Sequence, residues 1–146
     1  MTTRVLFVCT GNICRSAFAQ AAAEYLFETA GVAFTSAGTH AMTGEGATST
    51  MRVAAAELGI DLSTHRSTAL RDCDQPDLVF GMEGHHLVAV SRRFPDLPVT
   101  DIRLLDHPRA IEDPYGLDLD AYRHTVGTVM RALKSISFTL KSISFR

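Results

Sequence analysis

The sequence contains no tryptophan, only three cysteines, and no apolar run long enough to span a membrane. Its first apolar segment, residues 5–8, is also too short for the hydrophobic region of a secretory signal. Three cysteines are too few for a disulfide framework, so we expect free thiols in a reducing compartment. The sequence therefore predicts a cytoplasmic protein whose cysteines serve in chemistry rather than in structural disulfides.

Charge of one sign is not concentrated anywhere in the chain. The fourteen Lys and Arg residues are scattered, and the formal net charge is −2. Such a chain has no broad attraction for nucleic acid or membranes, which leaves room only for a local anion site. The six histidines do not pair with the cysteines at zinc-ligand spacing. We expect neither a metal nor an organic cofactor.

Strand-like and helix-like segments alternate along the 146 residues, a length that suits one domain. The expected strands are residues 4–9, 32–37, 77–82 and 99–104. The expected helices are residues 16–30, 50–58, 83–94 and 117–133. The first strand holds the continuous apolar run typical of a strand buried on both faces. The alternation predicts a single-domain α/β fold, flavodoxin-like, with a four-stranded parallel sheet and helices on both faces.

The C-terminus contains a short direct repeat. Residues 133–138 read LKSISF, and residues 140–145 read the same. Two short copies cannot build a repeat architecture. We therefore place the domain at residues 1–133 and treat residues 134–146 as a tail, which either extends the last helix or is a cloning or frame-related scar. No function is assigned to it.

The informative segment is residues 9–16, CTGNICRS, between the first strand and the first helix. In parallel α/β sheets, ligands bind beyond the carboxyl ends of strands, and a helix N-terminus offers free N–H groups to an anion. Five residues between Cys9 and Arg15 let one loop surround a tetrahedral oxyanion, and Gly11 allows close backbone approach. The planar guanidinium of Arg15 can donate two parallel hydrogen bonds to this oxyanion.

The same features stabilise a thiolate, which makes Cys9 the expected nucleophile. The Ser16 hydroxyl is expected to assist. Inorganic phosphate or another oxyanion is the expected guest of this loop. The expected phosphate-binding residues are Thr10, Gly11, Asn12, Ile13, Cys14, Arg15 and Ser16.

The segment VLFVCTGNICRS resembles the active-site signature of the low-molecular-weight protein tyrosine phosphatases. Residues 36–39 (SAGT), residues 59–61 (GID) with His65, and residues 113–115 (DPY) resemble further parts of that family. The similarity covers roughly residues 4–133. It implies the phosphotyrosine phosphatase I type of fold and hydrolysis of phosphotyrosine, in proteins or in small aryl phosphates, through a phosphocysteine intermediate.

Expulsion of an alkoxide or phenoxide requires a proton, and Asp113 is the carboxyl group that we expect to supply it. Cys9, Arg15 and Asp113 are thus the predicted catalytic residues. The resemblance implies that Tyr115 lines the mouth of the pocket and that Asn12 and His65 brace the loop.

The resemblance also suggests a redox response. In this family, a cysteine at the position of Cys14 can form a reversible disulfide with the nucleophile. Such a bridge would protect Cys9 from irreversible oxidation. We state this as a hypothesis.

The chain departs from the family pattern at several positions, and alternatives follow from these departures. Residues 39–51 contain no aromatic side chain that could flank a substrate ring. An arsenate reductase shares this fold but needs relay cysteines, for which Cys73 is the sole candidate outside the loop. A protein-arginine phosphatase is a closer alternative, although the resemblance implies that Ile13 favours an aryl phosphate. A non-catalytic phosphate- or phosphopeptide-binding module is the third.

Three polar residues follow the third expected strand. We interpret Glu83, His85 and His86 as solvated helix positions without a role in the site.

Overall fold

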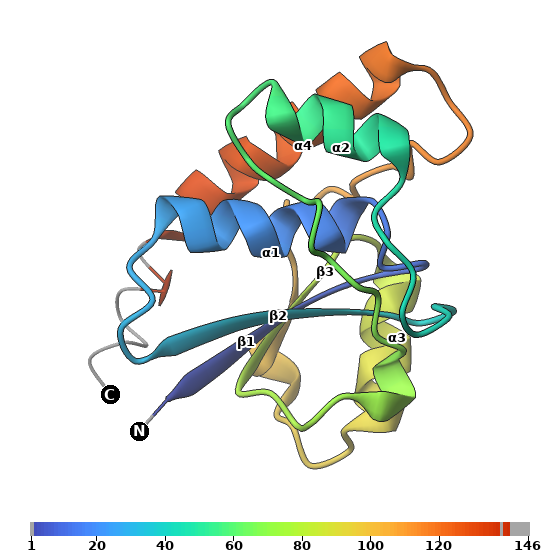
Figure 1. Ribbon diagram of the computed structural model, residues 1–146. Coiled ribbons are helices and arrows are strands. Elements are labelled where there is room, and N and C mark those ends of the chain that lie inside the picture. The colour runs from blue at the N-terminus through green and yellow to red at the C-terminus, as the bar shows by residue number, and fades with distance from the viewer. Residues whose placement is uncertain (1, 138, 141–146) are drawn as a thin grey trace.

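Four parallel strands form one sheet in the computed structural model, which describes residues 2–137, 139 and 140. The strand order is β2-β1-β3-β4, so β1 lies in the interior of the sheet (Figure 1). The strands are β1 (Thr3–Cys9), β2 (Val32–Gly38), β3 (Leu78–Gly81) and β4 (Ile102–Leu104). The helices are α1 (Arg15–Leu26), α2 (Ser49–Ala56), α3 (Gly84–Arg93) and α4 (Leu119–Ser135), with 3₁₀ turns η1 (Leu70–Asp72) and η2 (Val99–Asp101). The predicted fold class is confirmed.

The apolar run at the start of the chain explains the position of β1. Val5 and Phe7 belong to the larger core cluster, which also contains side chains of α1 and α4. Leu6 and Val8 belong to the second cluster, which contains side chains of α3. All four are at most 1% exposed. A strand that is apolar on both faces is stable only where layers cover both sides.

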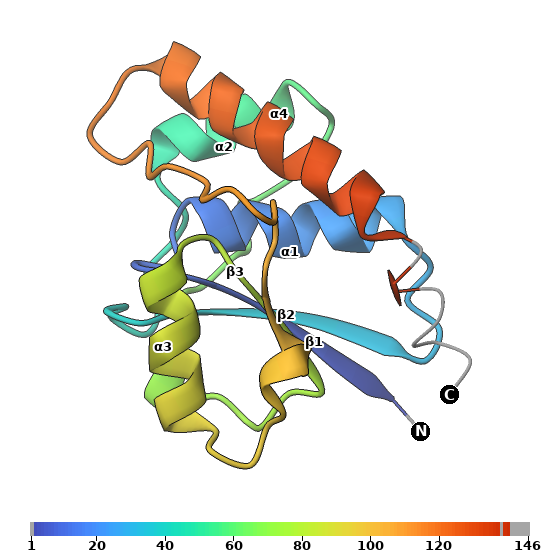
Figure 2. The ribbon, with the colours of Figure 1, turned by 180° about the vertical axis from the view of Figure 1, so that it is seen from behind.

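The helices divide unequally between the two faces of the sheet. Helices α1, α2 and α4 lie on one side, and α3 lies on the other (Figures 1 and 2). Helix α1 contributes small buried residues to the larger core cluster, among them Ala19, Ala22 and Ala23. With β1 and α1 both held by the core, the loop that joins them has two fixed ends.

Two predicted boundaries were wrong. Helix α1 ends at Leu26 rather than at residue 30, because Phe27 turns to an extended conformation and packs its ring 6.1 Å from that of Phe34. The expected strand 99–104 begins only at Ile102. Its first part is the turn η2, in which Val99 is 78% exposed and so lies outside the sheet and the core.

Helix α4 continues past residue 133 into the first copy of the C-terminal repeat. Leu140 is buried against the larger core cluster. Residues 141–145 of the second copy lie outside the described residues, and the division of the chain at residue 133 stays a prediction. Within the described part of the chain, every helix is too short or too polar to traverse a lipid bilayer.

Candidate active site

The loop between β1 and α1 is turned by Asn12, which has a φ of 56°. Asparagine tolerates this left-handed region because its short amide can hydrogen-bond locally. Asn12 Oδ1 accepts from the Thr68 backbone N–H at 2.9 Å, and Asn12 Nδ2 donates to Ser16 Oγ at 2.7 Å. The Asn12 side chain therefore ties the loop both to α1 and to the segment after α2.

Three hydrogen-bonding groups converge on the sulfur of Cys9. The backbone N–H groups of Asn12 and Ser16 donate to Sγ at 3.3 and 3.4 Å. Ser16 Oγ lies 2.8 Å from Sγ. Since that oxygen already accepts from Asn12, its own proton can point at the sulfur or at the backbone oxygen of Ala37, which lies 3.4 Å away. These donors surround the atom that the sequence predicts to be the nucleophile.

Arg15 is 1% exposed, and its guanidinium is held on one edge. Nη1 donates to Glu83 Oε2 at 2.6 Å and to the backbone oxygen of Ile111 at 2.7 Å. Nε is buried without a hydrogen-bond partner among the described residues. A buried unpaired donor is costly, so this edge of the guanidinium suits an external acceptor such as an oxyanion.

A cavity of about 200 Å³ brings the predicted catalytic groups together. Asp113 Oδ2 lies 3.6 Å from Arg15 Nη2, and Asp113 Oδ1 accepts from the Tyr115 backbone N–H at 3.1 Å. The side chain of Asp113 is 45% exposed, which suits a group that must exchange protons with water. The cavity is lined by Cys9, Thr10, Gly11, Ile13, Cys14, Arg15, Asp113 and Tyr115.

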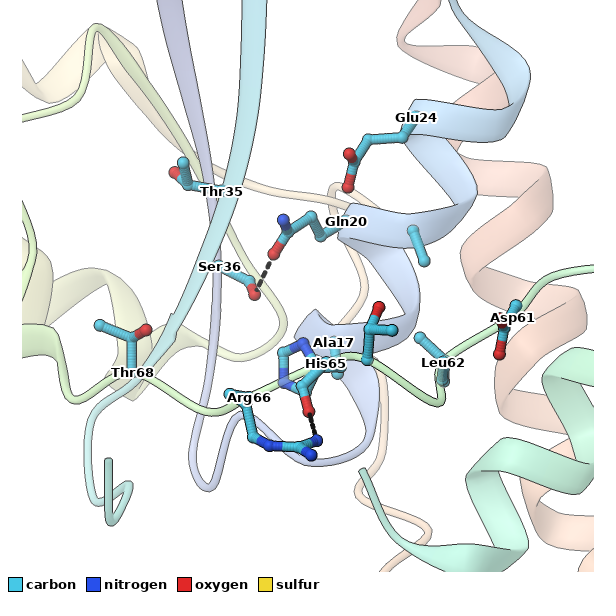
Figure 3. Close-up of a pocket in the computed structure, with 12 residues that line it drawn as sticks. Ala17, Gln20, Glu24, Thr35, Ser36, Asp61, Leu62, His65, Arg66 and Thr68 are labelled. Carbon is cyan, nitrogen blue, oxygen red and sulfur yellow. Dashed lines mark hydrogen bonds between the residues drawn. The ribbon is translucent and has the colours of Figure 1, made fainter. Parts of the chain in front are cut away.

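His65 lies behind the loop, where its Nε2 donates to the Asn12 carbonyl oxygen at 2.7 Å. Burial lowers the pKa of His65, against the opposing effect of that hydrogen bond. His65 also lines a larger hollow of about 510 Å³ between α1, β2 and residues 61–68 (Figure 3). In this hollow Ser36 Oγ donates to Gln20 Oε1 at 2.6 Å. No cysteine lines it, so the smaller cavity is the candidate site.

The family model described as low molecular weight phosphotyrosine protein phosphatase matches residues 4–143. The chain belongs to this family.

Curated relatives and solved structures agree with the family. A probable low molecular weight protein-tyrosine-phosphatase of Ralstonia solanacearum, EpsP, is 32% identical over 136 residues, covering 91% of this chain and 92% of the relative. A protein-arginine-phosphatase of Geobacillus stearothermophilus is 34% identical over 129 residues, covering 84% and 86%. The structure of Vibrio vulnificus Wzb in complex with benzylphosphonate matches with a TM-score of 0.82 and 26% identity, covering 92% and 97%.

In this low molecular weight phosphatase, the interpretation of Glu83 and His86 as solvated was wrong. Glu83 is the partner of Arg15, and the His86 ring is fully buried against the loop, with Nε2 3.0 Å from Thr10 Oγ1. Only His85, with 59% of its side chain exposed, lies in solvent as expected. A usable signal was present, because Glu83 follows β3 and the carboxyl ends of β1 and β3 meet at one edge of the sheet.

The donor atoms of Glu83, His85 and His86 lie within 4.8 Å of one another, as the ligands of a metal ion would. In this phosphatase, however, these donors already have protein partners. The Glu83 carboxylate pairs with Arg15, and both ring nitrogens of His86 are hydrogen-bonded. A metal ion would have to displace these contacts, so the cluster does not fit a resident metal.

The other two cysteines of the phosphatase differ in position. Cys14 lines the cavity beside Cys9, and its Sγ lies 3.5 Å from Thr48 Oγ1 and 3.8 Å from the Tyr122 hydroxyl. Burial raises the pKa of Cys14. Cys73 does not line the cavity, and burial raises its pKa as well. Its position gives no support to a cysteine relay of the kind an arsenate reductase needs.

Proposed function

We propose that the chain hydrolyses phosphate monoesters, with Cys9 as nucleophile, Arg15 as oxyanion ligand and Asp113 as general acid and base. One observation carries the proposal. The Cys9 sulfur, which accepts from two backbone N–H groups and lies 2.8 Å from the Ser16 hydroxyl, lines the same small cavity as Arg15, whose buried Nε has no hydrogen-bond partner among the described residues. Thiolate and guanidinium can thus reach one tetrahedral group from different sides.

The reaction has two displacements on phosphorus. The Cys9 thiolate attacks in line, a sulfur–phosphorus bond forms, and the bond to the leaving oxygen breaks as Asp113 gives that oxygen its proton. Arg15 and the loop N–H groups stabilise the equatorial oxygens. Asp113, now ionised, takes a proton from water, which attacks phosphorus and releases inorganic phosphate and the thiolate.

An aryl phosphate, and phosphotyrosine in particular, is the proposed substrate class. Ile13 and Tyr115 provide apolar surface on the wall of the cavity, where a substrate ring can pack. Benzylphosphonate, bound in the Vibrio vulnificus relative, has the same combination of ring and tetrahedral anion. Phosphoarginine is the second candidate, favoured by the similarity to a protein-arginine-phosphatase. We place the enzyme in the cytoplasm, because a catalytic thiolate must stay reduced.

Turnover of para-nitrophenyl phosphate tests the proposal. Wild-type protein should release nitrophenol, Cys9→Ser should abolish release, and the matched control Cys73→Ser should retain it. Tight binding of inorganic phosphate without turnover would instead identify a binding module. Rates on phosphotyrosine, phosphoserine and phosphoarginine peptides then separate the substrate classes, and faster release from phosphoarginine would overturn the aryl assignment.

A further inference from the structure

The protonation of His86 is determined by its backbone neighbour. Its Nδ1 lies 3.0 Å from the backbone nitrogen of Glu83, and a backbone N–H can only donate. Nδ1 must therefore be the unprotonated acceptor, which puts the ring proton on Nε2. Since Nε2 lies 3.0 Å from Thr10 Oγ1, His86 donates to the Thr10 hydroxyl.

A second donor approaches the same oxygen. Arg15 Nη2 lies 3.5 Å from Thr10 Oγ1, and a guanidinium can also only donate. With donors on both lone pairs, the Thr10 hydroxyl must point its own hydrogen elsewhere. No acceptor for it lies within hydrogen-bonding distance in the described part of the chain, and Thr10 lines the cavity beside Cys9.

We propose that the Thr10 hydroxyl donates a hydrogen bond to an oxygen of the bound phosphoryl group, and that His86 is the positioning residue that sets its direction. The loop would then donate hydrogen bonds to the phosphoryl group from the Thr10 side chain as well as from its backbone N–H groups. The catalytic part of this inference depends on the proposed function, whereas the oxyanion-binding part does not.

The direction of the hydroxyl is what distinguishes this role from simple packing. A threonine hydroxyl that accepted no hydrogen bond could rotate and turn its proton toward any neighbouring acceptor. Here His86 is fully buried and hydrogen-bonded at both nitrogens, so the hydroxyl is oriented before a substrate arrives. A donor that needs no reorientation contributes fully when negative charge develops on the phosphoryl oxygens.

Variants at the two positions separate the hydroxyl from its orientation. Thr10→Val keeps the shape and removes the hydroxyl, and kcat/KM for para-nitrophenyl phosphate should fall roughly tenfold, as expected for a hydrogen bond to a charged group. Thr10→Ser restores the hydroxyl and should recover a clear part of this loss. His86→Asn keeps an acceptor for the Glu83 N–H and removes the donor to Thr10, so kcat/KM should fall by roughly fivefold.

The deciding measurement is the double-mutant cycle. If His86 acts through Thr10, His86→Asn should cost little more in the Thr10→Val background. The control His85→Asn, on the exposed neighbour, should show no such coupling. Equal effects of His86→Asn in both backgrounds, or full activity of Thr10→Val, would overturn the proposal. Thermal unfolding of each variant confirms that it is folded.

Affinity for inorganic phosphate, measured by calorimetry, keeps this test separate from turnover. Thr10→Val should bind phosphate several-fold more weakly than the wild type, and His86→Asn should follow in the same direction. A wild-type protein that binds phosphate without turnover would contradict the proposed function. The Thr10 assignment would then be decided by the phosphate affinities of the wild type and Thr10→Val alone. Equal affinities of wild type and Thr10→Val would contradict the Thr10 assignment alone.

Discussion

Arg15 and Glu83, 68 positions apart in the chain, form an ion pair with 2.6 Å between Nη1 and Oε2. The pair holds Nη1, whereas Nη2 faces Thr10 and Asp113, and Nε has no hydrogen-bond partner among the described residues. The Arg15 guanidinium also lowers the pKa of Glu83, although partial burial acts in the opposite direction. Glu83 is therefore ionised under ordinary conditions and orients the guanidinium of Arg15, the proposed oxyanion ligand.

We expect Glu83→Gln to lower kcat/KM for para-nitrophenyl phosphate by about tenfold, because Arg15 loses the charged partner that fixes its orientation. The matched control is Glu57→Gln, which removes a carboxylate from the exposed pair with Arg123 and should leave activity unchanged. Steady-state kinetics on both variants decides. Equal activity of the two would remove Glu83 from the site.

Asp113→Asn should lower kcat by at least about a hundredfold for substrates with poor leaving groups, such as phenyl phosphate. The loss should be smaller for para-nitrophenyl phosphate, since nitrophenolate departs with less need of a proton. Glu112→Gln, at the exposed neighbouring carboxylate, is the control and should retain activity. A loss that does not depend on the leaving group would argue against general acid catalysis by Asp113.

Gly38, at the end of β2, lies where the loop between β1 and α1 packs against the strand. A Cβ at this position would stand 2.5 Å from the Thr10 backbone oxygen and 2.7 Å from the Ala41 Cβ. Gly38→Ala must therefore displace the loop, and we expect a loss of activity together with a lower Tm. Gly127→Ala in α4, where a Cβ meets nothing within 4 Å, should instead add up to about 1 kcal/mol of stability. Activity and thermal unfolding measure both.

His86 should make folding stability sensitive to mild acid. Burial, and then the charge of Arg15, lower the pKa of His86 from 6.5 to about 4 in the folded protein. The unfolded chain therefore takes up a proton more readily, so this contribution is complete above pH 6.5 and is lost as the pH falls toward 4. The loss should reach about 2 kcal/mol near pH 4.5. Urea unfolding of the wild type and of His86→Gln, measured above pH 6.5 and near pH 4.5, checks this. The free energy of unfolding should decline less with falling pH in the variant.

Cys14 gives a test of the redox hypothesis. Peroxide oxidises the Cys9 thiolate to a sulfenic acid, and attack by the Cys14 thiol releases water and forms a disulfide that dithiothreitol can reduce. Wild-type activity should recover after dithiothreitol, whereas Cys14→Ala should stay inactive because Cys9 proceeds to the sulfinic acid. Cys73→Ser is the control and should behave as the wild type. Equal recovery of Cys14→Ala would refute the hypothesis.

Several features could be predicted because they depend on residues that are neighbours in the chain. The apolar run 5–8, the loop and the start of α1 are contiguous, so local pattern was sufficient to predict the central strand and the placement of Cys9 and Arg15. The alternation of segments predicted the parallel sheet. Boundaries were less predictable, since Phe27 leaves the helical conformation and packs against Phe34, which belongs to another element.

The sequence by itself determined which groups this protein offers to an anion: the sulfur of Cys9, the guanidinium of Arg15 and the amides of the loop between them. Only the tertiary structure decided how these groups are oriented. Glu83 and His86 reach the loop because β3 pairs with β1 and delivers the start of α3 to the same edge of the sheet. Contacts across 68 and 76 residues follow from strand pairing in three dimensions, and no local pattern in the chain records them.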